Sequence, residues 1–208
     1  MLGNTILIGY SGHGYVVAEV AIENGMNIIG YSDKRELANN PFSLDYFGFE
    51  GAPDFAGWDK EVSFILGIGN NKVRHEIALL IENRGKTLQT IVHKTASVSG
   101  TSVIGSGTFI SRNAVVNTLA FIGKNVILNT GCVVEHECVL YDAAHIAPGA
   151  ILAGNVTIGE RSFIGANAVV KQGVTIGRNV TIGAGSVIIS DIPDGHVVVG
   201  NPGKILTK

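Results

Sequence analysis

Residues 122–152, IGKNVILNTGCVVEHECVLYDAAHIAPGAIL, contain the spacing that decides the fold of this chain. Ile122, Leu128 and Val134 are six residues apart, and aliphatic residues continue at this interval in both directions. The full series comprises Val92, Val98, Ile104, Ile110, Val116, Ile122, Leu128, Val134, Leu140, Ile146, Leu152, Ile158, Ile164, Val170, Ile176, Ile182 and Ile188. A helix places apolar residues every three or four positions and an exposed strand every two, so a strict interval of six predicts a hexapeptide β-helix.

Small side chains and glycines accompany the aliphatic series. Three hexads form one coil in proteins of this kind, so residues 18 apart should stack and the repeat should give about five coils. Glycines that directly follow aliphatic positions are expected to relieve crowding at the corners: Gly105, Gly123, Gly159, Gly165, Gly177 and Gly183. Cys132 and Cys138 occupy the small-residue position of consecutive hexads and are expected to be buried thiols, with neither a disulfide nor a metal.

The composition of the 208-residue chain narrows its class. Hydrophobic residues make up 46% of it, charged residues 15%, and the net charge is −2. Lys and Arg are spread along the sequence, which argues against a nucleic-acid or membrane-surface partner. No apolar run reaches about 18 residues, and residues 1–5 lack a basic segment of a secretory signal, so a cytoplasmic protein is expected.

The repeat occupies only the second half, which predicts two domains, residues 1–91 and 92–208. In the first half, short apolar strands alternate with helical patterns, which predicts a small parallel, Rossmann-like sheet. Strands are expected at Ile6–Ile8, Asn27–Tyr31, Val62–Leu66 and Leu88–Ile91, and helices over Val16–Ile22 and Lys72–Glu82. Residues 38–60, which contain Trp58, are expected to be an irregular lid or surface crossover.

The loop after the first expected strand is a candidate phosphate site. Gly9-Tyr10-Ser11-Gly12-His13-Gly14 leads into a helix, whose N-terminal N–H groups and dipole favour an anion. Its spacing differs from the dinucleotide fingerprint, so a merely tight turn is the alternative. Asp33, just after the second strand, is a candidate for contacting a ribose or base, or else a solvated turn residue.

The candidate catalytic group is Glu135-His136-Glu137, three ionisable residues at positions where most hexads have small, amide or hydroxyl side chains. An imidazole held by a carboxylate is a common general base, and either glutamate could hold His136. Stacking by 18 residues places Gly154 beside His136, where its N–H could stabilise an oxyanion. The alternative is that His136 is a surface residue without a catalytic role. A zinc site using His136 and His145 is a minor hypothesis, because their spacing fits a known scaffold poorly.

Five motifs in chain order carry a resemblance to a known family. They are Gly9-Tyr10-Ser11-Gly12-His13-Gly14, Gly67-Ile68-Gly69-Asn70-Asn71 with Arg74, Glu135-His136-Glu137-Cys138, Ala153-Gly154-Asn155-Val156 and Val199-Gly200-Asn201-Pro202. Together they resemble the sugar acetyltransferases of the NeuD/PglD type over nearly the whole chain. The resemblance implies a left-handed parallel β-helix after the α/β module, a homotrimer with active sites between subunits, acetyl-CoA along the helix and a nucleotide-linked sugar in the N-terminal module.

The resemblance also implies roles for individual residues. His136 would be the general base, Glu137 its orienting partner, His145 a neighbour of the acetyl thioester and Gly154 the donor to its carbonyl. Ala166, Ala184, Gly200 and Pro202 would border the rest of the cofactor. The sugar nucleotide would contact Gly9, Ser11, Gly12, His13, Gly14, Asp33, Gly69, Asn70 and Asn71. No metal is implied.

The expected activity is N-acetylation of a nucleotide-linked amino sugar, with a UDP-4-amino-4,6-dideoxy-N-acetylhexosamine as the best candidate. A sugar O-acetyltransferase of the sialic acid type is the alternative, because a hydroxyl acceptor would also use His136. A trimeric scaffold without catalysis is a third hypothesis, and it predicts no CoA binding.

Overall fold

The structure is a computed structural model and describes residues 3–206. The chain divides into two compact units, Met1–Ile91 and Val92–Lys208. None of the helices it describes is both long and apolar enough to span a membrane.

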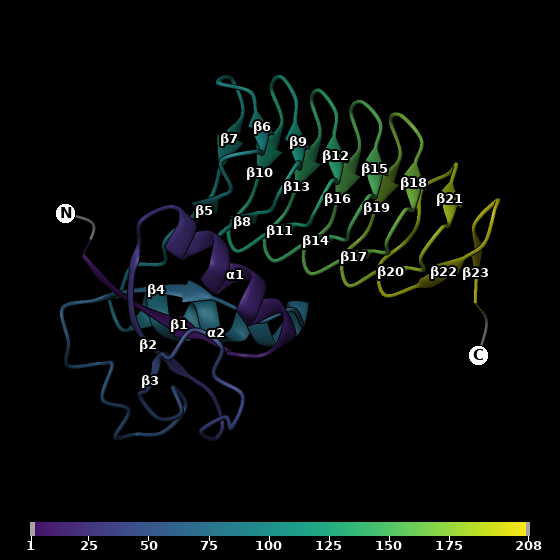
Figure 1. Ribbon diagram of the computed structural model, residues 1–208. Coiled ribbons are helices and arrows are strands. Elements are labelled where there is room, and N and C mark those ends of the chain that lie inside the picture. The colour runs from purple at the N-terminus through teal and green to yellow at the C-terminus, as the bar shows by residue number, and fades with distance from the viewer. Residues whose placement is uncertain (1–2, 207–208) are drawn as a thin grey trace. The chain divides into compact units, whose positions relative to one another are not determined.

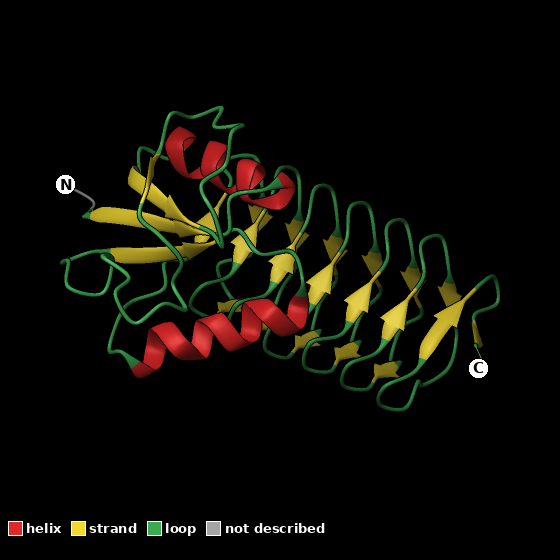
Figure 2. Ribbon diagram, turned by 90° about the horizontal axis from the view of Figure 1, so that it is seen from below, coloured by secondary structure: helices red, strands yellow, loops and turns green. Residues whose placement is uncertain are grey.

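The first unit is a four-stranded parallel sheet with one helix on each side (Figure 2). The strand order is β3 (Asp45–Tyr46), β2 (Asn27–Ser32), β1 (Asn4–Ile8) and β4 (Ser63–Leu66). The helices are α1 (Gly12–Glu23) and α2 (Asn71–Asn83). The predicted α/β module is therefore confirmed.

The expected strand at Leu88–Ile91 is only partly present. Leu88 forms an isolated parallel bridge with Phe64 of β4. Ile91 instead begins β5 (Ile91–Val92), which pairs in a sheet of the β-helix. The apolar run contains both a sheet contact of the first unit and the first repeat strand, so the prediction of one continuous strand was wrong.

Residues 38–60 form a crossover that contributes to the core of the first unit. Phe55 and Trp58 are 3% and 8% exposed, and their rings pack edge to face with centroids 5.0 Å apart. They belong to one apolar cluster with Ile6, Phe64 and Leu66. A segment anchored by two buried aromatic side chains is not a lid, so of the two expected alternatives the crossover is present and the lid is not.

The second unit is a left-handed β-helix with three strand faces (Figure 1). The first face contains β5, β8 (Phe109–Ile110), β11 (Ile127–Leu128), β14 (His145–Ile146), β17 (Phe163–Ile164), β20 (Thr181–Ile182) and β22 (Val197–Val199), with β23 (Lys204–Ile205) antiparallel at its end. The second contains β6 (Ser97–Val98), β9 (Val115–Val116), β12 (Val133–Val134), β15 (Ile151–Leu152), β18 (Val169–Val170) and β21 (Val187–Ile188). The third contains β7 (Val103–Ile104), β10 (Phe121–Ile122), β13 (Val139–Leu140), β16 (Thr157–Ile158) and β19 (Thr175–Ile176).

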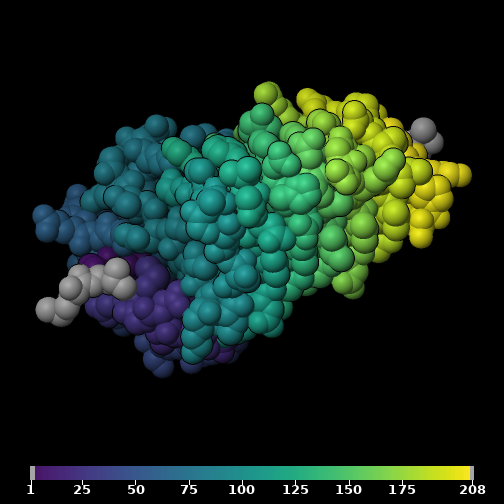
Figure 3. Space-filling model, turned by 90° about the horizontal axis from the view of Figure 1, so that it is seen from above, coloured from purple at the N-terminus to yellow at the C-terminus, as the bar shows by residue number. Residues whose placement is uncertain are grey.

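The six-residue interval places one aliphatic side chain of each strand inside the coil. Ile122, Leu140 and Ile158 pair in register on the third face, and all three are fully buried. The space-filling view shows a continuous surface along the second unit (Figure 3). The estimate of about five coils was slightly low, because the second face alone stacks six strands. Stacking these apolar side chains is what stabilises the solenoid.

The corners of the coils need a left-handed backbone at one position in every six. From Gly107 to Gly185 each such position has a positive φ, and Asn113, Glu137 and Asn155 are among its non-glycine members. Gly105 and its equivalents were expected to be the corner residues, but the positive φ values occur two residues later in each hexad, so that prediction was wrong. Gly105 is needed where coils approach, because a Cβ there would lie 2.6 Å from the carbonyl carbon of Gly123.

Both cysteines are buried structural thiols, as expected. Cys132 and Cys138 are fully buried in the solenoid core and neither forms a disulfide. Burial raises the pKa of Cys132 to about 12 and also raises the pKa of Cys138. The Cys138 Sγ donates to the carbonyl oxygen of Ala153 on the next coil at 3.2 Å. These thiols are therefore poor nucleophiles.

Candidate active site

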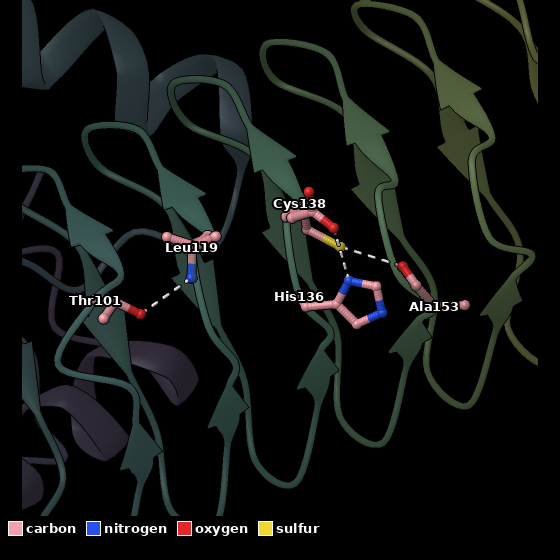
Figure 4. A network of polar contacts seen from close by, with 6 residues as sticks. Thr101, Leu119, His136, Cys138 and Ala153 are labelled. Carbon is pink, nitrogen blue, oxygen red and sulfur yellow. Dashed lines mark hydrogen bonds and ion pairs between the residues drawn. The ribbon is translucent and has the colours of Figure 1, made fainter.

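His136 lies at the corner between β12 and β13, where the chain passes from the second face to the third. Its Nδ1 is 3.1 Å from Oε2 of Glu137. Figure 4 shows the ring extending toward the coil that carries Ala153. The side chains of His136 and Glu137 are 50% and 59% exposed, so a substrate can reach them. The structure thus selects Glu137, rather than Glu135, as the partner of the imidazole.

The contact with Glu137 fixes which nitrogen of His136 is available. A neutral imidazole that donates Nδ1–H to the carboxylate keeps a lone pair on Nε2. No other hydrogen bond to the His136 ring is found within residues 3–206. This arrangement presents Nε2 as a proton acceptor at an open corner of the coil.

Gly154 lies directly against His136 on the adjoining coil, as the 18-residue stacking predicted. The amide of Asn155 donates to the carbonyl oxygen of His136 at 2.8 Å, which fixes the two coils in register. A Cβ on Gly154 would lie 2.5 Å from Nε2 of His136. Within the described part of the chain, the Gly154 N–H has no hydrogen-bond acceptor. A proton acceptor and an amide donor therefore lie side by side.

His145 lies elsewhere on the coil, in β14 of the first face. It is 8% exposed, and its ring packs edge to face on Phe163 with centroids 5.0 Å apart. Its Nε2 is 3.3 Å from Nδ2 of Asn129. Within one chain the structure therefore does not bring His145 to the His136 corner. Residues 3–206 contain no group of three His, Cys, Asp or Glu side chains arranged to hold a metal.

The other residues expected to contact the cofactor form a row at a different corner. Ala166 and Ala184 follow β17 and β20, where the chain passes from the first face to the second. The Gly185 amide donates to the Ala166 carbonyl at 2.8 Å, and the Gly200 amide to Ser186 Oγ at 3.1 Å. Pro202 follows through a cis peptide bond, and Ala184, Gly200 and Pro202 are exposed. This row and the His136 corner are thus two separate edges of one coil stack.

In the first unit, a pocket of about 270 Å³ opens at the carboxyl ends of β1, β2 and β4. Strand order places β2 and β4 on opposite sides of β1, and such a switch point is where open α/β sheets bind ligands. Five residues predicted from the sequence line it: Gly9, Ser11, Asp33, Gly69 and Asn70. The sequence reasoning missed Lys34, Phe49, Glu50 and Val73 as lining residues.

Asp33 connects the ends of two strands through its carboxylate. Its Oδ2 accepts from the Tyr10 amide at 3.0 Å and its Oδ1 from the Lys34 amide at 2.7 Å. It therefore holds the glycine loop against the end of β2 while also facing the pocket.

The loop before α2 forms another wall of the pocket and is held by a buried arginine. Arg74 is 1% exposed and donates to the carbonyl oxygens of Ile68 and Gly69 at 3.2 and 3.1 Å. It also donates to Oδ1 of Asn71 at 3.0 Å, while Asn70 caps the helix by accepting from Val73. Burial lowers the pKa of Arg74 to about 9. Asn71 thus stabilises the loop and does not line the pocket.

Three glycine-loop residues that were predicted to contact the sugar nucleotide do not line the pocket either. Gly14 is buried, and a Cβ there would overlap the carbonyl oxygen of Gly9, so its glycine is needed for close packing of α1 on the loop. Gly12 is exposed at the start of α1. Burial, with a smaller effect from the charge of Arg74, lowers the pKa of His13 to about 4. His13 is therefore neutral at neutral pH.

Comparison with known families matches both units. Residues 4–80 match the PglD N-terminal domain, and residues 155–190 match the bacterial transferase hexapeptide repeat. UDP-N-acetylbacillosamine N-acetyltransferase from Bacillus subtilis is 33% identical over 120 residues. That alignment covers 51% of this chain and only 50% of the relative, so it extends over half of that protein's length.

Two solved structures match over essentially the full chain. The acetyltransferase domain of PglB from Neisseria gonorrhoeae, in complex with acetyl coenzyme A, is 36% identical with a TM-score of 0.92. The match covers 99% of this chain and 100% of that domain. A mutant of perosamine N-acetyltransferase from Caulobacter crescentus, with CoA and GDP-perosamine, is 32% identical with a TM-score of 0.93, covering 100% and 99%. The chain belongs to the NeuD/PglD-type sugar acetyltransferases, a family of hexapeptide-repeat enzymes.

Proposed function

We propose that this protein transfers the acetyl group of acetyl-CoA to the amine of a nucleotide-linked amino sugar. The best candidate acceptor is a UDP-4-amino-4,6-dideoxy-N-acetylhexosamine. The observation that carries the proposal is the His136 corner, where Nδ1 faces Glu137 and Nε2 is open beside Gly154. The names of the relatives support it: two are N-acetyltransferases, one of them in complex with CoA and GDP-perosamine, and the third is an acetyltransferase domain in complex with acetyl-CoA.

The proposed reaction is direct acyl transfer. The sugar nitrogen attacks the thioester carbonyl carbon while Nε2 of His136 takes a proton from that nitrogen. Glu137 holds the ring and stabilises the imidazolium that forms. The Gly154 amide donates to the carbonyl oxygen as it becomes negative. The C–N bond replaces the C–S bond, the CoA thiolate leaves, and the proton on His136 returns to the sulfur, so no covalent enzyme intermediate is needed.

The two substrates would bind different units. The diphosphate of the sugar nucleotide would lie at the N-termini of α1 and α2, next to Ser11, Gly69 and Asn70. Asp33 would face the nucleoside. Acetyl-CoA would follow the row of Ala166, Ala184, Gly200 and Pro202, with its thioester near His145.

The separation of the two corners supports a homotrimer. His136 with Gly154 and the row of Ala166 with Ala184 lie on different edges of one chain, so one complete site needs edges from two chains. The second face between these edges carries an aliphatic row that points outward: Val115, Val133, Ile151, Val169 and Val187. Ile151 is 40% exposed. An apolar face of this kind is suited to packing against another copy.

The test is to incubate the protein with acetyl-CoA and a panel of UDP- and GDP-linked 4-amino sugars and sialic acids, with product detection by mass spectrometry. The proposal expects a mass increase of one acetyl group on a nucleotide-linked amino sugar. Acetylation of sialic acid alone would show an O-acetyltransferase instead. A thermal-shift titration with CoA addresses the scaffold hypothesis, because a ligand that binds the folded state raises its stability and a scaffold would show no shift.

A further inference from the structure

The pocket of the first unit has two chemically different ends. Ser11 and Gly69 to Asn70 lie where helices α1 and α2 begin, and N–H groups at helix N-termini attract phosphate. Asp33 and Glu50 supply carboxylates at the end of β2, where Glu50 contacts Ser32, and Lys34 and Phe49 also line the pocket. Carboxylates repel phosphate and accept hydrogen bonds, so this end is suited to an uncharged group that donates.

Glu50 is the unusual member of this end. It lines the pocket, yet it is only 6% exposed. Ser32, which is fully buried, donates its hydroxyl to Oε2 of Glu50 at 2.6 Å, and the Glu50 amide donates back to the same hydroxyl at 2.9 Å. No further hydrogen bond to this carboxylate is found in residues 3–206. Oε1 of Glu50 can therefore accept a further hydrogen bond.

Although Glu50 is mostly buried, its Oε1 is not among the fully buried polar atoms without a partner, so this oxygen is open to the pocket and can accept a further hydrogen bond. A ligand that brings an N–H to Oε1 forms a charge-assisted hydrogen bond there. Nucleobases differ in what they can bring: uracil has a ring N3–H and guanine a ring N1–H, whereas cytosine N3 and adenine N1 carry lone pairs. At the ring nitrogen, a carboxylate attracts the N–H of uracil and guanine and repels the lone pair of cytosine and adenine, whose only donors on this edge are their exocyclic amines.

We propose that Glu50 is a specificity-determining residue that accepts the ring N–H of the nucleobase of the sugar nucleotide. The inference rests on the proposed function, because it assumes a nucleotide in this pocket. Phe49 supplies an apolar surface beside the base. A carboxylate that accepts from the ring nitrogen consequently favours uracil and guanine nucleotides over cytosine and adenine nucleotides.

The experiment measures the dissociation constants of UDP, GDP, CDP and ADP by calorimetry for the full-length protein and for Glu50→Gln. The wild-type protein is expected to bind UDP or GDP at least about 10-fold more tightly than CDP and ADP, since a site built around an N–H rejects analogues without it. Whichever of UDP and GDP binds more tightly identifies the base. Glutamine still accepts from Ser32, but its amide can also donate to cytosine N3, so Glu50→Gln should reduce the preference over CDP to roughly 3-fold or less.

Glu61→Gln is the matched control, because Glu61 is exposed and does not line the pocket. It should keep the wild-type preference. If the wild-type protein binds all four nucleotides equally, or if Glu50→Gln keeps the full preference, the role of Glu50 is overturned while acetyl transfer to a sugar nucleotide still stands. A wild-type protein that binds none of the four overturns both the role of Glu50 and this part of the proposed function.

Discussion

The imidazole of His136 rests on the backbone of Gly154, so closely that a Cβ on Gly154 would lie 2.5 Å from Nε2. The nitrogen proposed to take the substrate proton and the amide proposed to face the oxyanion are thus held together by the stacking of two coils. Any side chain at position 154 must displace the ring.

Gly154→Ala tests this relationship. The added methyl group should move the His136 ring and lower kcat by roughly 100-fold, since a displacement of about 1 Å can have that effect. Gly100→Ala is the control, because Gly100 occupies the same corner row three coils earlier and a Cβ there meets nothing within 4 Å. Steady-state kinetics with unchanged melting temperatures in both variants would isolate the effect on the ring. Equal activity of the two variants would contradict the proposed contact.

His136→Ala removes the proposed base. Turnover should fall by about 100-fold or more, because general base catalysis typically contributes that much. The binding of CoA should be nearly unchanged, since the proposed CoA row lies at another corner of the coil. Kinetics and calorimetry on the same preparation check both parts. Near wild-type turnover would show that another group takes the proton.

Glu137→Gln tests the partner of the imidazole. Glutamine can still contact Nδ1 but no longer stabilises the imidazolium, so kcat should fall by at least roughly 10-fold with little change in KM. Glu135→Gln is the comparison, because Glu135 stands on the other side of His136 in sequence and does not contact its ring. A larger loss in Glu135→Gln than in Glu137→Gln would reverse this assignment.

Arg74 is predicted to position the pocket wall that precedes α2. Arg74→Met removes the donors to the Ile68 and Gly69 carbonyls and should raise KM for the sugar nucleotide, while KM for acetyl-CoA stays the same. Arg74→Lys should recover only part of the affinity, since an ammonium lacks the planar fork that reaches three acceptors. Equal increases in both KM values would indicate general loss of structure instead.

The sequence predicted the second unit more completely than the first, for a physical reason. A strict six-residue interval fixes the register of every coil, so the neighbour of His136 follows by adding 18 residues to its number. In the first unit, Glu50 lies in a segment without periodicity, and only the folded crossover brings it to Ser32. The packing role of Gly14 was likewise hidden, because a glycine in a loop looks the same whether it faces a phosphate or another backbone.

The low pKa of His13 predicts a loss of stability in mild acid. Burial is the main cause, and it lowers the pKa to about 4 from an ordinary value of 6.5. Between these two values the unfolded chain binds a proton that the folded chain does not, so stability rises with pH through this window and falls as the pH drops. The stabilisation from this pKa shift is complete above about pH 6.5 and amounts to roughly 3 kcal/mol of unfolding free energy.

Denaturant unfolding from pH 4 to 7 should show this rise of stability with pH, and His13→Gln should flatten it. His196→Gln is the control, because it replaces a partly exposed histidine of the second unit. An unchanged slope in His13→Gln would place the acid sensitivity at other groups.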